Sequence, residues 1–220
     1  MTGLRLRRPG RGLRSLLVAA LALAGFILAG QGLWIEAKAF LAQILLERAF
    51  AQSLASGETV KPWSWFDSWP VARIEVPRLG KATIALEGAS GQALAFGPAH
   101  VAGTPQAGEA GTAVYAAHRD THFAFLRDVA DGDEVRITRR DGHLASYRIT
   151  GHAVVRWDSS GIDPSAPGRH LVLATCWPFG ALYSGPLRYV VYGEMTETAH
   201  NLAVSPATSA VGAGAQPASR

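Results

Sequence analysis

Three side-chain types in this chain could together carry out covalent catalysis: a thiol, an imidazole and a guanidinium. The only cysteine, Cys176, ends the mostly apolar run 170–175 and is followed directly by Trp177-Pro178. A single thiol cannot form an internal disulfide, and a structural zinc site usually needs several sulfur or imidazole ligands. Cys176 is therefore either a buried small hydrophobe or a nucleophile at a strand end, where the proline makes the chain leave a sheet.

A cysteine attacks as its thiolate, so a catalytic thiol needs a neighbouring histidine or a positive field. The chain has seven histidines, of which His118 has the most suggestive place. It ends the strand-like run 111–117 and opens the polar stretch Arg119-Asp120-Thr121-His122. A strand end that opens into a loop suits a catalytic group, although a structural histidine is common at such a place. His143 beside a turn and His200 in a tail of small residues are poorer candidates.

Arg188 is the third candidate and lies inside the strand-like run 187–192. An arginine in such a run usually faces solvent on an alternating strand. It can instead point into a cleft, where a guanidinium stabilises the oxyanion of a tetrahedral intermediate. Spacing alone leaves both interpretations open.

The elements that would position these residues are short β-like runs separated by turns. The expected strands cover 71–76, 82–86, 111–117, 134–139, 145–155, 170–176 and 187–192. Asp141-Gly142 between two of them is a hairpin signal. Segments 90–96 and 122–129 each predict a short helix or helical turn, and neither is long enough to cross over between parallel strands. The pattern predicts a mainly β fold, a closed or nearly closed β-barrel.

The first 35 residues point to a membrane. Residues 16–35 are almost wholly apolar, and about 20 such residues cross the hydrocarbon core as a helix. Five arginines in residues 1–15 place the N-terminus in the cytoplasm, and without them the net charge of +4 becomes −1. A near-neutral body argues against nucleic-acid binding. A cleaved signal peptide is the alternative, but the apolar run is long and no Ala-x-Ala site follows. We expect an uncleaved anchor.

Residues 36–69 connect this anchor to the β region. Residues 36–54 are good helix formers and Gly57 is a plausible C-cap, so a helix is expected, either a free stalk or packed on the domain. Trp63, Trp65 and Trp69 suit a membrane interface or the packing of one barrel end, and packing is favoured. Beyond the barrel, residues 196–220 are mostly small and predict a disordered tail.

The combination of these motifs resembles the sortases, membrane-anchored cysteine transpeptidases. The resemblance rests on Leu173-Ala174-Thr175-Cys176, on Pro178, on Arg188 after an interval, and on His118 well upstream. It covers residues 36–195 in the family's order. Longer strings resemble the proteobacterial (Gram-negative) branch: residues 69–74, 76–80, 94–100, 116–123, 175–179 and 185–190. Ala117 and Val172 depart from the general pattern, where many sortases have Gly and Thr, which weakens any transfer of substrate preference.

The resemblance implies a role for each candidate. Cys176 would attack the carbonyl of a C-terminal LPXTG-like sorting signal and form a thioester, and His118 would protonate the leaving amine. Arg188 would hold the substrate and the oxyanion, supported by Thr175. An amine acceptor would then take the substrate protein from the thioester. Asp120 and His122 either tune His118 or satisfy the loop after the strand, and the second reading is favoured.

The implied layout places a single-pass protein in the cytoplasmic (inner) membrane with its catalytic domain outside the cytoplasm. The expected parts are a basic N-terminus (1–15), an anchor in lipid (16–35), a helical stalk and Trp-rich linker (36–69), the barrel (70–195) and a tail (196–220). The expected partners are a substrate protein and an amine acceptor, and no nucleic acid. No cofactor or metal is required: the acidic run 131–134 favours a turn over a calcium site.

Two rival interpretations remain at this point. Another envelope thiol enzyme is one, but an L,D-transpeptidase would show a His-Gly-Cys-type cluster that residues 174–177 lack, and a papain-like peptidase has its Cys before its His. The other is a catalytically silent, membrane-tethered β-barrel, in which Cys176 would be buried and inert.

Overall fold

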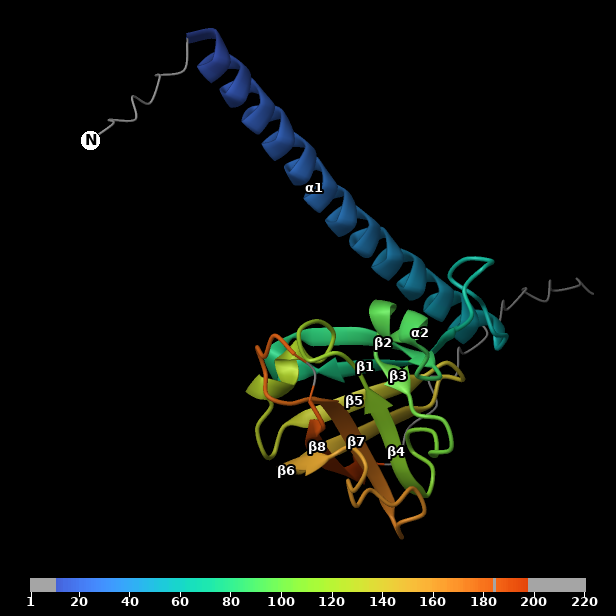
Figure 1. Cartoon of the computed structure of the whole chain (residues 1–220). Coiled ribbons are helices and arrows are strands. Elements are labelled where there is room, and N and C mark those ends of the chain that lie inside the picture. Colours follow the sequence, from blue (N-terminus) through green and yellow to red (C-terminus); the bar gives the residue numbers. More distant parts are fainter. Residues whose placement is uncertain (1–10, 184, 198–220) are drawn as a thin grey trace, which may run out of the picture.

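A computed structural model describes residues 11–183 and 185–197, and the first element in it is one continuous helix, α1 (Arg11–Ser56) (Figure 1). The expected anchor and stalk are therefore parts of the same helix. Among the described residues, α1 is the one helix long and apolar enough to cross a membrane. Three of the N-terminal arginines and residues 198–220 of the expected tail lie outside the described residues.

The rest of the chain forms a closed eight-stranded barrel, as the sequence predicted (Figure 1). The order around the barrel is β1-β2-β3-β4-β7-β8-β6-β5. The strands are β1 (Pro70–Val76), β2 (Lys81–Glu87), β3 (Ala99–His100), β4 (Gly111–Ala116), β5 (Glu134–Arg139), β6 (Leu144–Arg156), β7 (Arg169–Cys176) and β8 (Leu187–Glu197). β3 was not predicted, and β8 runs to Glu197, past the expected domain boundary at residue 195.

The short connections follow the local sequence. Asp141-Gly142 turns the chain between β5 and β6, with Gly142 at a φ of 83° that favours glycine. Ser90 caps α2 (Gly91–Phe96) by accepting a 3.1 Å hydrogen bond from the Ala93 amide. The second predicted helical segment is a 3₁₀ helix, η2 (Ala124–Asp128).

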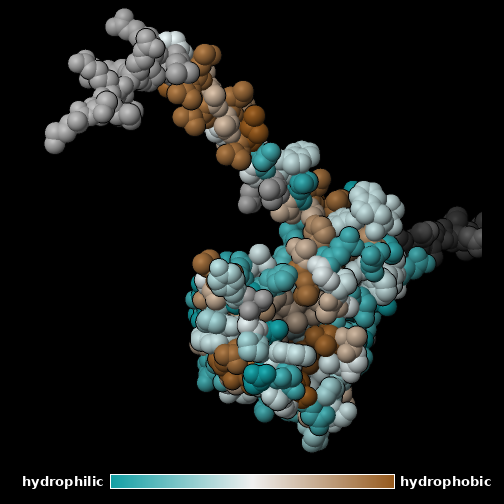
Figure 2. Space-filling model, viewed as in Figure 1, coloured by the Kyte–Doolittle hydropathy of each residue, from teal (hydrophilic) through white to brown (hydrophobic). Residues whose placement is uncertain are grey.

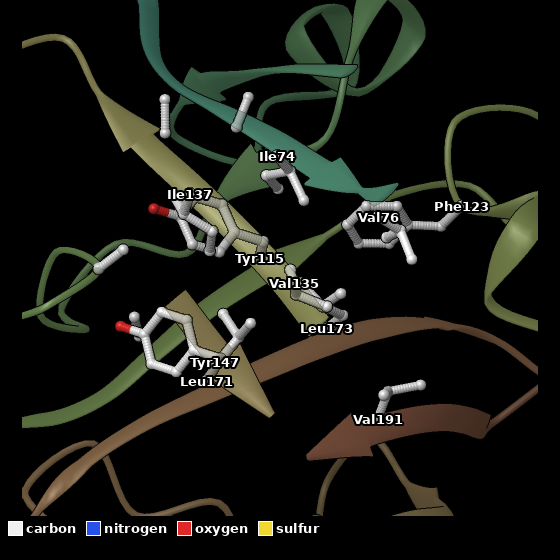
Figure 3. Packing of buried hydrophobic residues seen from close by; sticks show 14 of the residues in the cluster. Ile74, Val76, Tyr115, Phe123, Val135, Ile137, Tyr147, Leu171, Leu173 and Val191 are labelled. Carbon is white, nitrogen blue, oxygen red and sulfur yellow. The ribbon is translucent and has the colours of Figure 1, made fainter. Parts of the chain in front are cut away.

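The barrel interior is filled by the inward-facing side chains of its strands (Figure 3). Ile74, Tyr115, Ile137, Tyr147 and Leu171 are all fully buried there. Because side chains alternate along a strand, the remaining positions face outward, and those at one end of β4, β7 and β8 line the functional site.

The last turns of α1 pack on the outside of this barrel. Leu46 and Phe50 are buried in a cluster with Phe66, Ile84, Leu86 and Ala93, flanked by Trp63 and Phe96. Gln43 Nε2 donates a 2.8 Å hydrogen bond to the carbonyl of Phe96 in α2, and Glu47 forms an ion pair with Arg73 of β1. The packed alternative is therefore confirmed for this part of the helix.

The tryptophan-rich linker divides between packing and exposure. Trp63 contacts the rings of Phe66 and Phe96 at centroid distances of 4.6 and 5.1 Å, and Trp69 packs against the main core. Trp65 is exposed. Packing is thus confirmed for two of the three indoles.

Candidate active site

The strand register brings the three residues with catalytic chemistry to one end of the barrel. β7 and β8 are antiparallel, and Cys176, the last residue of β7, lies opposite Arg188 near the start of β8. β4 runs parallel to β7, with Ala116 opposite Ala174, so both strands end on the same side. His118 follows β4 by two residues and reaches the same edge as Cys176.

These residues line one groove of about 410 Å³ on the outer face of β4, β7 and β8. His118, Thr175, Cys176 and Arg188 all contribute to its wall. The other lining side chains are largely apolar and come from α2, from β6, from the β6–β7 connection and from β8: Leu94, Val155, Trp157, Ile162 and Val190. A mostly apolar cleft with a few convergent polar groups is typical of a site for a small or extended ligand.

Thr175 joins β7, the strand that carries Cys176, to the segment of His118. Its buried hydroxyl donates a 2.7 Å hydrogen bond to the carbonyl of Ala117. The Ala117 amide in turn donates a 3.1 Å hydrogen bond to the carbonyl of Ala174. Ala117 was expected inside a strand, but β4 ends at Ala116, and Ala117 lies in the groove wall directly before His118.

Arg188 is half-buried and held by its own backbone surroundings. Its Nη1 donates to the carbonyls of Gly185 at 2.8 Å and of Leu187 at 2.9 Å. These bonds fix the guanidinium in the groove wall, opposite the cysteine. Among the described residues, Nε and Nη2 have no hydrogen-bond partner, so these two donors face no competing protein acceptor.

The two residues considered for tuning His118 have different surroundings. His122 is half-buried, and burial lowers the pKa of its imidazole; a hydrogen bond to the Ala95 carbonyl opposes this shift, and the nearby His118 adds to it. Asp120 instead forms an ion pair with Arg119, with 3.3 Å between Oδ2 and Nε. The structure therefore brings His122 into electrostatic contact with His118.

Arg119 is a structural residue that the sequence alone did not single out. Its side chain is buried, and its Nη2 donates to the carbonyls of Ala181 and, at 3.1 Å, Tyr183. It thereby ties the segment after His118 to the connection between Cys176 and Arg188. No sequence signal indicates this role, because the acceptors are backbone carbonyls distant in the chain.

The acidic run 131–134 forms a turn that enters β5, as predicted. The Asp133 carboxylate accepts a 2.7 Å bond from Arg78 Nη2 and a 2.8 Å bond from the Ala130 amide. The bond from Arg78 lowers the pKa of Asp133.

No group of three or more metal-ligating side chains occurs in residues 11–183 and 185–197.

Comparison with known proteins identifies the family to which this barrel and its groove belong. The family model for the sortase domain matches residues 74–196. Sortase D of Bacillus subtilis (strain 168) is 28% identical over 121 residues, which are 55% of this chain and 61% of that protein. The chain thus spans less than two thirds of the length of this relative.

Solved structures agree with the family match. Sortase E from Streptomyces avermitilis is 32% identical with a TM-score of 0.50, over 59% of this chain and 89% of that one. A Clostridium perfringens sortase D5 transpeptidase has a TM-score of 0.56 over 71% of this chain and 99% of that one, and at 20% identity it supports the fold alone.

The matched region covers more than half of the chain and contains every strand that lines the groove. This assignment excludes the L,D-transpeptidase and papain-like alternatives. The chain belongs to the sortase family of cysteine transpeptidases.

Proposed function

We propose that this protein cleaves a C-terminal sorting signal through a thioester on Cys176 and transfers the substrate protein to an amine acceptor. The observation that carries the proposal is the single groove lined by Cys176, His118 and Arg188. The family implies sorting-signal substrates in general, and the LPXTG-like form of the signal is part of the proposal.

In the first half-reaction, the Cys176 sulfur attacks the scissile carbonyl carbon and forms a tetrahedral intermediate. The negative charge on its oxygen faces Arg188, whose free N–H groups can donate to it. His118 donates a proton to the leaving amine as the carbon–nitrogen bond breaks. The products are an S-acyl thioester and the released C-terminal part of the signal.

In the second half-reaction, an amine acceptor attacks the thioester carbonyl. His118, now neutral, removes a proton from the attacking amine, and the Cys176 thiolate leaves as the new amide forms. Water in place of the amine gives slow hydrolysis. Each step uses side chains of this chain only, so the proposal includes no cofactor.

The apolar groove wall supports a substrate with apolar residues before the scissile bond. Leu94, Val155 and Ile162 line this groove and can bury such side chains. We further propose that the protein belongs to the proteobacterial branch, on the strength of the longer motif strings around His118 and Cys176.

The proposed location is the inner membrane. Residues 16–35 of α1 would span the bilayer, with 1–15 in the cytoplasm and the barrel of 70–195 on the outer side. Residues 36–69 would join anchor to barrel, and 196–220 would form a tail. The apolar span and its exposed side chains support this arrangement (Figure 2).

The test uses the full chain in lipid nanodiscs with a peptide that ends in an LPXTG-type signal. Hydroxylamine should release a hydroxamate from the acyl thioester, and Cys176→Ala should abolish this product. Full activity of Cys176→Ala would show the mechanism to be wrong. Persistent activity of His118→Ala or Arg188→Ala would remove only the role of that residue, and an inactive wild type would favour the silent barrel.

A further inference from the structure

The exposed apolar side chains of the barrel lie at the end of β6 and in the β7–β8 connection, and one of them, Trp157, lines the groove. Outside α1, the described residues include five exposed large hydrophobic side chains. One of these, Trp65, lies in the linker. Val154 and Trp157 lie at the end of β6, and Leu182 and Tyr183 lie in the β7–β8 connection. The side chains of Leu182 and Tyr183 are 92% and 85% exposed.

Three of these residues form what we call the aromatic rim: Trp157, Leu182 and Tyr183. β6 is antiparallel to β8, so the end of β6 lies beside the start of β8. The Trp157 amide donates a 2.9 Å hydrogen bond to the carbonyl of Pro186, which places Trp157 next to the β7–β8 connection. Arg119 holds the carbonyls of Ala181 and Tyr183 from the protein side, so the backbone is tied down while the apolar side chains face outward.

The β7–β8 connection, which carries Leu182 and Tyr183 of the aromatic rim, is linked to α1 by a chain of contacts. Arg119 belongs to the same segment as His122, whose ring contacts the Ala95 carbonyl of α2, and α2 is bonded to α1 through Gln43. In Figure 1 the β7–β8 connection, coloured orange, lies at the barrel edge on the side of the projecting half of α1. The rim and the apolar span therefore share one side of the molecule.

The distance between span and barrel is short. α1 begins to pack on the barrel at Ala42, seven residues after the expected span ends at residue 35. Seven helical residues rise about 10 Å, which is within the headgroup layer and the water next to it. Because α1 continues without a break from the span to Ser56, it sets the height of the barrel above the expected span.

Tryptophan and tyrosine are the residues enriched at membrane interfaces, and a cluster of exposed apolar side chains on one edge marks a contact surface. We propose that the aromatic rim contacts the headgroup region of the same bilayer that α1 crosses, so that the protein meets the membrane at two places. The inference rests on the proposed anchoring of residues 16–35. It places the groove opening at the bilayer surface and links lipid contact to the His118 segment through Arg119.

The lone cysteine makes a direct test possible. Cys176 is the only cysteine of the chain, so the Cys176→Ala variant contains no thiol. A single cysteine is introduced by Leu182→Cys, Tyr183→Cys, Leu23→Cys in the span or Ser165→Cys in the β6–β7 connection, where Ser165 is exposed. Each full-length variant is spin-labelled in lipid nanodiscs, and its collisions with oxygen and with a water-soluble nickel chelate are compared by power saturation.

We expect the oxygen-to-nickel collision ratio to be highest at 23, lowest at 165 and intermediate at both 182 and 183. Equal ratios at 182, 183 and 165 would place the aromatic rim in water and overturn the inference while the anchor stands. Protection of 182 and 183 from both reagents would indicate a protein contact and also overturn it. A water-like ratio at 23 would contradict the anchor itself. Near-ultraviolet circular dichroism confirms that each labelled variant is folded.

Discussion

The Thr175 hydroxyl donates a 2.7 Å hydrogen bond to the carbonyl of Ala117, the residue that precedes His118. Thr175 is itself the residue before Cys176. One buried side-chain bond therefore joins the backbone beside Cys176 to the backbone beside His118. Together with the bond from the Ala117 amide to the Ala174 carbonyl, it holds the segment that leads into His118 against β7, beyond the end of β4.

Thr175→Val should weaken both stability and turnover. The valine keeps the shape of the threonine but leaves the buried Ala117 carbonyl without this donor, at a cost of about 1–3 kcal/mol. We expect kcat/KM for signal cleavage to fall about tenfold or more, because a loss of ~1.4 kcal/mol in transition-state stabilisation already gives a factor of ten. Peptide cleavage kinetics and thermal unfolding measure the two effects.

Thr175→Ser is the matched control for this prediction. The serine retains the hydroxyl, so the bond to Ala117 can form and most of the activity should return. An equal loss in Thr175→Ser, which retains the hydroxyl, would show that the hydrogen bond to Ala117 does not account for the loss in Thr175→Val.

Arg188→Lys should lower turnover although it preserves the positive charge. A lysine cannot hold the carbonyls of Gly185 and Leu187 while it presents further donors to an oxyanion, as the planar guanidinium can. We expect kcat to fall by about 10²–10³-fold, the range for loss of an oxyanion donor. Arg156→Lys is the control, since Arg156 is exposed on β6 and paired with Asp158. Comparable kcat losses in both variants would contradict the proposed role.

The sequence predicted the barrel from local signals, and it indicated the three catalytic candidates through the family resemblance of their combined motifs. Alternating strands and the turn at Asp141-Gly142 are readable from neighbouring residues, as is the motif around Cys176. Arg119 was missed because its acceptors lie 62 and 64 positions away. β3 was missed because it has only two residues, Ala99 and His100, which are too few to show the alternation of apolar and polar side chains typical of a strand.

The continuity of α1 also escaped the sequence analysis. The charged residues Glu36 and Lys38 resemble a boundary between an anchor and a stalk. Both are good helix formers, so the helical backbone continues through them. Whether the later turns stand free or pack depends on Phe66 and Ile84, which are remote in sequence.

His122 should make the protein less stable at mildly acidic pH. Burial lowers the pKa of His122 in the folded state below its usual value of 6.5, so the unfolded chain binds the proton first as pH falls. The free energy of unfolding should therefore be highest above pH 6.5 and decrease below it. His122→Gln should flatten this decrease, as measured by denaturant unfolding across the pH range. The same flattening in His143→Gln, in the β5–β6 turn, would argue against a specific effect of His122.

Phe50→Ala should show how strongly α1 is joined to the barrel. Phe50 is 4% exposed and packs with Leu46 and Phe66, so its truncation leaves a cavity and costs about 3–5 kcal/mol of unfolding free energy. Phe40→Ala removes the same side chain ten residues earlier on the same helix, where it is 70% exposed, and should change stability by no more than about 0.5 kcal/mol. Denaturant unfolding of both full-length variants in one detergent gives the comparison. Equal stabilities would mean that α1 contributes little to the folded barrel and would contradict a rigid connection between the two.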